Sequence, residues 1–289
     1  MLGSFLECCT LQNLVLYTLA NCILPWYAMW RNRAMKPDKE RDIERFAPWV
    51  RLDYDEWNPF LVPFTHFFFL PRYCGLLTIL VMAVTLTQII CMGSHVDRLG
   101  PTQKWLLVQM VCVFIVPFYM FFGYYSVTRN RPEVDYSKWL GPDWEPSYDG
   151  ASILISNHTG FNEILNTFLF IRPMPGFIAK HGVKQVPSIG PLATSVGSVF
   201  MDRRNPESRK RTFDEILRNQ QLAEKGEGHP LMIFPEGCNT NGKYLIKFKK
   251  GAFWNLKPVQ PFINKTTGLR CKGEMGDVGN IWHWSFLIS

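Results

Sequence analysis

The sequence has no Cys-x-x-Cys pair, although eight cysteines are scattered over its 289 residues. Zinc ribbons and thiol redox sites need closely spaced cysteines, and small secreted domains need a dense disulfide framework. We therefore expect neither a metal site nor a disulfide scaffold. The cysteines in apolar surroundings are interpreted as small buried hydrophobic residues. They are Cys8, Cys22, Cys74, Cys91 and Cys112.

Charged residues are also scarce, at 19% of the chain, whereas 47% of the residues are hydrophobic and 15% are aromatic. This composition excludes disorder, and it carries less charge than the roughly 25% that is typical of soluble domains. We expect a folded chain that is partly embedded in lipid. The net charge of +7 suits a partner with phosphates, such as an anionic lipid or a nucleotide-bearing molecule. Nucleic acid is not expected, because no recognition motif for it is found.

Two long stretches of the sequence carry no charge, residues 74–92 and 105–125. Each is about as long as a helix that crosses a hydrocarbon core of roughly 30 Å. Between them, residues 93–104 contain glycine, proline and charged side chains, which end helices. This pattern predicts a membrane helical hairpin within residues 61–130, either spanning the bilayer or entering it only shallowly. A hairpin buried in a soluble core is the less favoured alternative.

The N-terminal region, residues 1–60, is predicted to be an interfacial segment. Its apolar run from Leu11 to Trp30 is interrupted by asparagine and proline, and no basic region precedes it, which argues against a secretory signal. Arg72 and Arg129 on the outer flanks of the hairpin weakly favour a cytosolic location for those flanks.

After residue 150, short apolar runs alternate with helical patterns. The runs at 152–156 and 231–234 predict strands, and residues 164–171 and 206–224 predict helices. Alternation of this kind is typical of an α/β fold. We therefore expect residues 131–289 to form an α/β domain with a central mixed sheet flanked by helices.

The strongest polar motif is the segment from Asn157 to Glu163, where a predicted strand ends and a helix begins. Ligands collect at such strand ends in open α/β sheets. His158 and Glu163 would lie about 140° apart on one regular helix, so they can pair only if His158 precedes the helix. A paired Glu163 would orient the imidazole, which could then take a proton from a hydroxyl group. The alternative is a helix cap through Thr159 or Asn162.

A second motif follows the second strand. Residues 237–243 match the first seven positions of a phosphate-binding P-loop, but Tyr244 stands where that motif needs serine or threonine. Nucleotide hydrolysis is therefore not favoured. Small residues here still suit a loop that approaches a phosphate or glycerol, and an ordinary surface turn is the alternative. In a third stretch, residues 197–204, Arg203 could bind a phosphate bidentately or be a solvated surface arginine.

The order of these blocks resembles that of the glycerolipid acyltransferase family, which includes the 1-acylglycerol-3-phosphate and lysophosphatidylcholine acyltransferases. The resemblance extends over roughly residues 151–262, and residues 245–253 look particularly like the lysophosphatidylcholine branch. The blocks that carry it are Asn157 to Glu163, Gly197 to Arg203, Phe234 to Gly237, and Val259 to Phe262.

The resemblance implies transfer of an acyl group from acyl-CoA to the free hydroxyl of a lysophospholipid. His158 would be the general base, with Glu163 as its catalytic partner, and the only cofactor-like molecule would be acyl-CoA, as co-substrate. No metal is implied. The residues expected to bind substrate are Asn157, Arg203, Glu236, Gly237, Asn241, Gly242 and Lys243.

This sequence departs from the family pattern at Glu163, where aspartate is usual, and at Cys238, where threonine is usual. These departures motivate an alternative, a catalytically silent, lipid-binding subunit of a larger membrane assembly. The family's default location is the endoplasmic reticulum membrane, and a mitochondrial membrane is the alternative. Glycosylation sequons occur at Asn157 and Asn264, and a glycan on Asn157 would disable the site. The site is therefore expected to face the cytosol or a matrix-like compartment.

Overall fold

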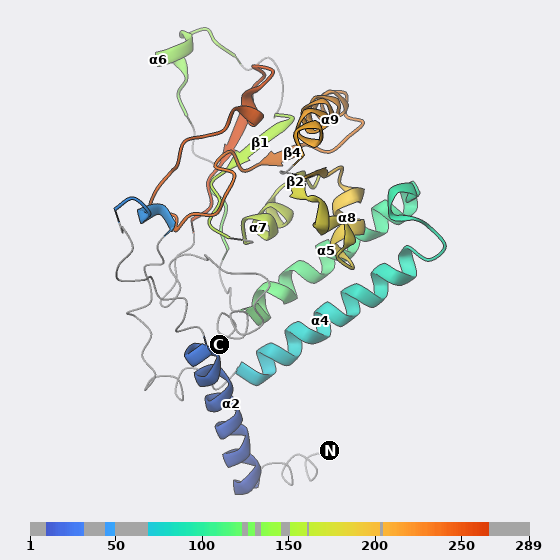
Figure 1. Cartoon of the computed structure of the whole chain (residues 1–289), viewed down its shortest axis with the longest axis vertical. Coiled ribbons are helices and arrows are strands. Elements are labelled where there is room, and N and C mark those ends of the chain that lie inside the picture. The colour runs from blue at the N-terminus through green and yellow to red at the C-terminus, as the bar shows by residue number, and fades with distance from the viewer. Residues whose placement is uncertain are drawn as a thin grey trace.

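The structure, a computed structural model, describes residues 10–31, 44–49, 69–122, 127–130, 134–145, 151–160, 162–202 and 205–265. Its centre is a five-stranded sheet with the strand order β3-β2-β4-β1-β5 (Figure 1). The strands are β1 (Ile153–Ser156), β2 (Gly176–Lys180), β3 (Val199–Met201), β4 (Leu231–Ile233) and β5 (Val259–Phe262). The helices that surround the sheet are α7 (Asn162–Phe170), α8 (Ile189–Ser195) and α9 (Pro206–Glu224).

The α/β class is confirmed, but the expected mixed sheet is not what the described strands form. All four strand pairings in the described part of the chain are parallel. One of α7, α8 and α9 lies between each two successive strands from β1 to β4. A helical crossover carries the chain back to the end of the sheet at which the previous strand began, so the next strand runs in the same direction.

Both faces of the sheet are covered, as a parallel sheet requires. Leu154 and Met232 belong to a core cluster that includes side chains of α7 and α8, whereas Ile153 and Leu231 pack on the other side with Ile216 of α9. Neighbouring residues of a strand point to opposite faces, and this alternation divides the core into two layers.

The predicted hairpin is formed by α4 (Phe69–Ile90) and α5 (Pro101–Phe122). Both helices are long and apolar enough to cross a membrane. Arg72 fastens the open end of the hairpin, since its guanidinium donates to the carbonyl groups of Phe121 and Phe122 at 3.2 and 3.0 Å. Cations are favourable at a helix C-terminus, where carbonyl groups lack partners. A side chain at Gly75 would collide with the ring of Phe121, so the two helices approach closely there.

The two hairpin helices have different surroundings. Leu107, Met110, Ile115 and Tyr119 of α5 belong to the same core cluster as Leu154 of the sheet. α5 therefore lies along the α/β domain, next to α7 and α8, and α4 lies outside it (Figure 1). The apolar side chains exposed on α4 are Leu77, Leu80, Val81, Met82, Val84, Leu86 and Ile89. Because so much of this apolar surface is exposed, a hairpin buried in a soluble core does not describe it.

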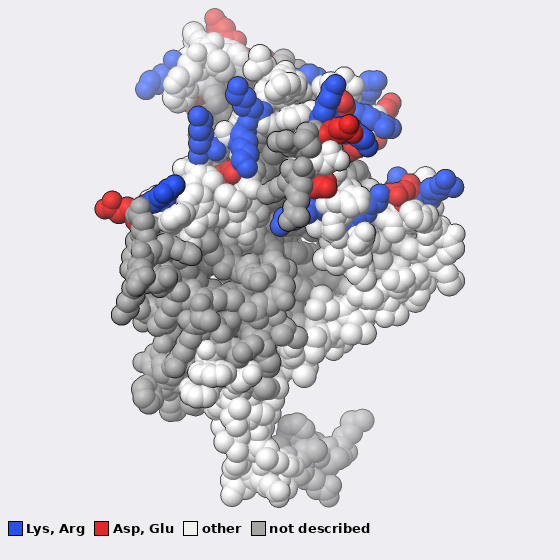
Figure 2. All heavy atoms as spheres, viewed as in Figure 1, with Lys and Arg blue, Asp and Glu red and all other residues white. Residues whose placement is uncertain are grey.

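The N-terminal apolar run forms α2 (Leu11–Arg31), which points away from the α/β domain. The buried Asn21 joins it to α4: its side-chain oxygen accepts from the backbone N–H of Leu70 at 2.9 Å, and its side-chain nitrogen donates to the carbonyl of Tyr17 at 2.8 Å. On the face in Figure 2, charged side chains gather over the α/β domain and the hairpin turn, whereas the described surface of α2 and α4 is largely uncharged. Many of the side chains exposed on these two helices are large and apolar. These features indicate a membrane protein.

The turn of the hairpin is attached to the domain by an ion pair. Lys184, in the short helix η5 (His181–Gln185), lies 2.5 Å from Asp97. The hydrogen bond and charge of Lys184 hold the pKa of the Asp97 carboxyl below its usual value.

Candidate active site

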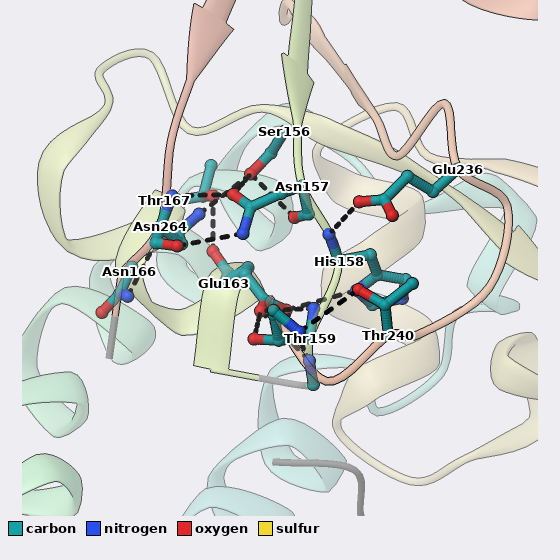
Figure 3. A network of polar contacts seen from close by, with 12 residues as sticks. Ser156, Asn157, His158, Thr159, Glu163, Asn166, Thr167, Glu236, Thr240 and Asn264 are labelled. Carbon is teal, nitrogen blue, oxygen red and sulfur yellow. Dashed lines mark hydrogen bonds and ion pairs between the residues drawn. The ribbon is translucent and has the colours of Figure 1, made fainter. Parts of the chain in front are cut away.

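His158 lies between the end of β1 and the start of α7, where it can meet an acid on the helix. Its Nδ1 is 3.2 Å from Oε2 of Glu163 (Figure 3). The structure thus brings together the two residues that the sequence singles out, in the only local arrangement that allows them to pair. The extra methylene of glutamate does not prevent the contact.

Glu163 also organises the turn that carries His158. Its side chain is only 2% exposed, against 20% for that of His158. The carboxylate accepts hydrogen bonds from the backbone N–H of Thr159 at 2.8 Å and of Gly160 at 3.0 Å, and from the Thr159 hydroxyl. The same carboxylate thus holds the backbone N–H groups of the two residues that follow His158 while it pairs with the imidazole. Thr159, one of the two residues expected as a helix cap in the alternative interpretation, instead donates its hydroxyl to Glu163.

The imidazole plane of His158 is fixed by aromatic stacking. The ring lies against Phe234 with a centroid distance of 4.1 Å and an interplanar angle of 15°, and Phe234 in turn stacks on Phe177. Since Nδ1 faces Glu163, Nε2 lies on the opposite side of the ring. Within the described part of the chain it has no hydrogen-bond partner, so it is available to a substrate.

The loop after β4 holds the backbone of His158. Glu236 is buried, and its Oε1 accepts from the backbone N–H of His158 at 3.0 Å. The backbone N–H of Thr240 donates to the carbonyl of His158 at 2.8 Å. A buried carboxylate is tolerated only when it is hydrogen-bonded, and Glu236 is placed to position His158.

Two glycines of this loop have the left-handed backbone that glycine favours, Gly237 at φ +72° and Gly242 at φ +74°. A Cβ on Gly237 would lie 2.5 Å from Nζ of Lys249, and one on Gly242 would lie 3.0 Å from the methyl group of Thr159. The loop is thus folded back closely against the turn that carries the histidine. It also places the ammonium of Lys249 beside the site, a residue that the sequence reasoning did not single out, although it lies in the 245–253 motif.

Asn241 joins the loop to a distant part of the chain. Its side chain donates to the carbonyl of Ala47 at 2.7 Å and accepts from the backbone N–H of Lys243 at 3.1 Å, and its own N–H donates to the carbonyl of Pro48 at 2.8 Å. The asparagine is buried and Lys243 is exposed. No helix follows the loop within residues 241–249, so the strand-loop-helix geometry of a P-loop is not formed.

Two further residues that the sequence predicts to bind substrate are Asn157 and Arg203. Asn157 exchanges two hydrogen bonds with the backbone of Asn264, at 3.0 and 2.8 Å, which ties the end of β1 to the end of β5. Arg203 lies outside the described residues. Within the described ranges, no three histidine, cysteine or acidic side chains are grouped so that they could hold a metal ion.

A parallel α/β sheet with a histidine-carboxylate pair after its first strand is the arrangement that the resemblance to an acyltransferase domain leads us to expect. The Acyltransferase family model matches residues 130–263. This match supports the predicted resemblance to the glycerolipid acyltransferases over this region of the chain.

Several curated proteins are similar to the chain. The lysophospholipid acyltransferase LPEAT1 of Arabidopsis thaliana is 33% identical over 186 residues, which cover 58% of this chain and 45% of the relative. Lysophosphatidylcholine acyltransferase 2 of Homo sapiens is 37% identical over 111 residues, which cover 38% of this chain and 19% of the relative. The chain thus spans less than half the length of these relatives. No solved structure matches it significantly.

Proposed function

We propose that this protein transfers a fatty acyl group from acyl-CoA to the free hydroxyl of a lysophospholipid, with His158 as general base. The observation that carries the proposal is the His158–Glu163 pair, whose Nδ1···Oε2 contact leaves Nε2 free at the end of a parallel strand. The names of the relatives, which are lysophospholipid acyltransferases, support the choice of acceptor.

In the proposed reaction, Nε2 of His158 removes the proton from the acceptor hydroxyl as its oxygen attacks the thioester carbonyl. The C–S bond then breaks, and the CoA sulfur leaves and takes a proton from the imidazolium. Glu163 accepts the hydrogen bond of Nδ1–H and stabilises the positive charge that the ring carries between these two transfers. The products are a diacyl phospholipid and free CoA.

Basic residues around the site would bind the phosphates of the two substrates. Lys249 lies beside Gly237, next to the loop that holds His158. Among the described residues it has no acidic partner within ion-pair distance, so its charge is available to a phosphate. Arg203 and Lys243 remain proposals for the same role, and guanidinium is the better bidentate ligand.

We further propose that the protein lies on the cytosolic face of the endoplasmic reticulum membrane. An N-glycan is attached to the side-chain nitrogen of asparagine. In both sequons this nitrogen is engaged inside the site: that of Asn157 donates to the carbonyl of Asn264, and that of Asn264 donates to Ser156. Glycosylation of either would break these contacts, which favours a face without the glycosylation machinery.

The test is CoA release by the detergent-purified protein with a panel of lysophospholipids and acyl-CoAs. We expect His158→Ala to lose at least about 100-fold in kcat, the scale of general-base catalysis. Glu163→Gln keeps the size of the side chain but removes its charge, and it should lose activity by a smaller factor. His181→Ala, at an exposed histidine of η5, is the matched control and should retain wild-type rates. Full activity of His158→Ala would refute the proposal and favour a lipid-binding relative without catalysis.

A further inference from the structure

A chain of hydrogen bonds runs from the membrane hairpin to the active site. It begins at Tyr119, a buried residue near the end of α5, whose hydroxyl donates to Oδ1 of Asn166 on α7 at 2.5 Å. The side-chain nitrogen of Asn166 then donates to Oδ1 of Asn264 at 2.9 Å. Three elements that are far apart in the sequence are thereby joined through side chains alone.

Asn264, which follows β5, is the centre of this network (Figure 3). Its side-chain nitrogen donates to the hydroxyl of Ser156 at 3.0 Å, and that hydroxyl donates to the carbonyl of Asn157 at 3.0 Å. The backbone of Asn264 exchanges both hydrogen bonds with the side chain of Asn157. Every polar group of Asn264 is therefore used. Apart from the bond with Asn166, all of its hydrogen bonds go to Ser156 and Asn157, the two residues that precede His158.

These contacts lead us to propose that Tyr119, Asn166 and Asn264 are positioning residues for the histidine base. They fix the backbone of Asn157 and, through it, the direction of the His158 ring, and they tie that direction to α5, which lies in the hairpin. None of the three touches His158 or is expected to touch substrate. The inference rests on the proposed function, because it assigns a purpose to holding this histidine in place.

The physical reason is the sensitivity of proton transfer to geometry. A displacement near 1 Å can reduce a rate by about 100-fold. Within the described part of the chain, the backbone N–H and carbonyl of His158 are bound by the loop after β4, through Glu236 and Thr240. The network holds the preceding residues from the opposite side. A hydrogen bond to a partly buried amide also has a defined direction, which apolar packing alone does not provide.

The experiment uses the full chain and substitutions that remove single hydrogen bonds. Tyr119→Phe deletes only the hydroxyl, and Asn264→Asp keeps the oxygen but loses the donor to Ser156. Tyr136→Phe and Asn219→Asp, at positions remote from the network, are the matched controls. We expect Tyr119→Phe to lower kcat by about 3- to 10-fold, the scale of one hydrogen bond, with KM for both substrates unchanged. Asn264→Asp should lower kcat further.

Two additional measurements separate positioning from stability. The rate at which diethyl pyrocarbonate modifies His158 should change in Tyr119→Phe and Asn264→Asp but not in the controls. The losses from Tyr119→Phe and Asn166→Ala should not add in the double variant, because both act through one network. Unchanged kcat and unchanged modification rates in both network variants would overturn the inference. So would a loss of activity that merely follows the fraction of unfolded protein.

The activities of the variants distinguish an error in the positioning network from an error in the proposed function. If His158→Ala is inactive while Tyr119→Phe and Asn264→Asp match the wild type, only the positioning network is wrong. If His158→Ala keeps full activity, the proposed base itself is wrong.

Discussion

Helices α4 and α5 are both 22 residues long and both are apolar enough for a membrane, yet they face different surroundings. Leu107 of α5 is 0% exposed and packs in the core of the α/β domain, whereas Leu80 of α4 is 49% exposed. Two helices of similar hydrophobicity in this protein thus have different surroundings: α5 packs against the α/β domain, and α4 exposes its apolar side chains. Hydrophobicity alone does not decide which surface a helix contacts, because that depends on the elements that pack beside it.

The largest expected difference between the two helices is in stability. Leu107→Ala should reduce the free energy of unfolding by about 2–5 kcal/mol, because it leaves a cavity in the core. Leu80→Ala removes the same atoms from an exposed surface and should change stability by about 0.5 kcal/mol or less. Thermal unfolding in detergent micelles measures both. Equal losses would mean that the two helices share one environment.

A charge on the exposed face of α4 should weaken membrane binding. Val81 is 63% exposed, and a lysine in the centre of a bilayer costs up to about 3 kcal/mol. We expect Val81→Lys to reduce cosedimentation with neutral phosphatidylcholine vesicles while the protein remains folded. Val134→Lys adds the same charge outside the hairpin and serves as the control. If the two variants bind vesicles equally well, α4 is not the lipid-facing helix.

The smallest expected effect is at the turn between the helices. Lys184 lowers the pKa of Asp97, so this ion pair stabilises the fold above the ordinary pKa of a carboxyl group. Its contribution is lost as the pH falls through the lowered value. Because the pair is partly exposed, it is worth about 0.2–1 kcal/mol. Asp97→Asn should therefore lower the melting temperature slightly at pH 7 and not at low pH, and an equal shift at both would exclude this role.

Local signals made part of the fold predictable. The expected helix at 206–224 has the same bounds as α9, because Asn205 caps it and Pro206 occupies its first turn. The hairpin helices are predicted from the uncharged runs alone, and α4 and α5 begin five and four residues earlier than those runs. Arg72 lies inside α4, where its hydrogen bonds to α5 make the charge tolerable.

Other features could not be predicted because they depend on contacts between distant residues. β2 and α8 lie in short segments with no clear periodicity, and packing against the sheet and α5 defines them. Asn264 contacts Asn166 and Ser156 across 98 and 108 positions of the chain, and no local pattern announces that. In contrast, the His158–Glu163 pair was predictable, because both residues lie within one turn and its helix.

The region that matches the family model is smaller than the part of the chain that forms the core of the α/β domain, because the core includes α5. The family match begins at residue 130, whereas α5 ends at Phe122. Without α5, the sheet face that carries Leu154 and Met232 would lose part of its cover and be exposed to water. The hairpin also leaves the ribosome before any strand of the sheet. Synthesis therefore delivers the apolar helices to the membrane first, and the catalytic sheet then assembles on a surface that is already anchored.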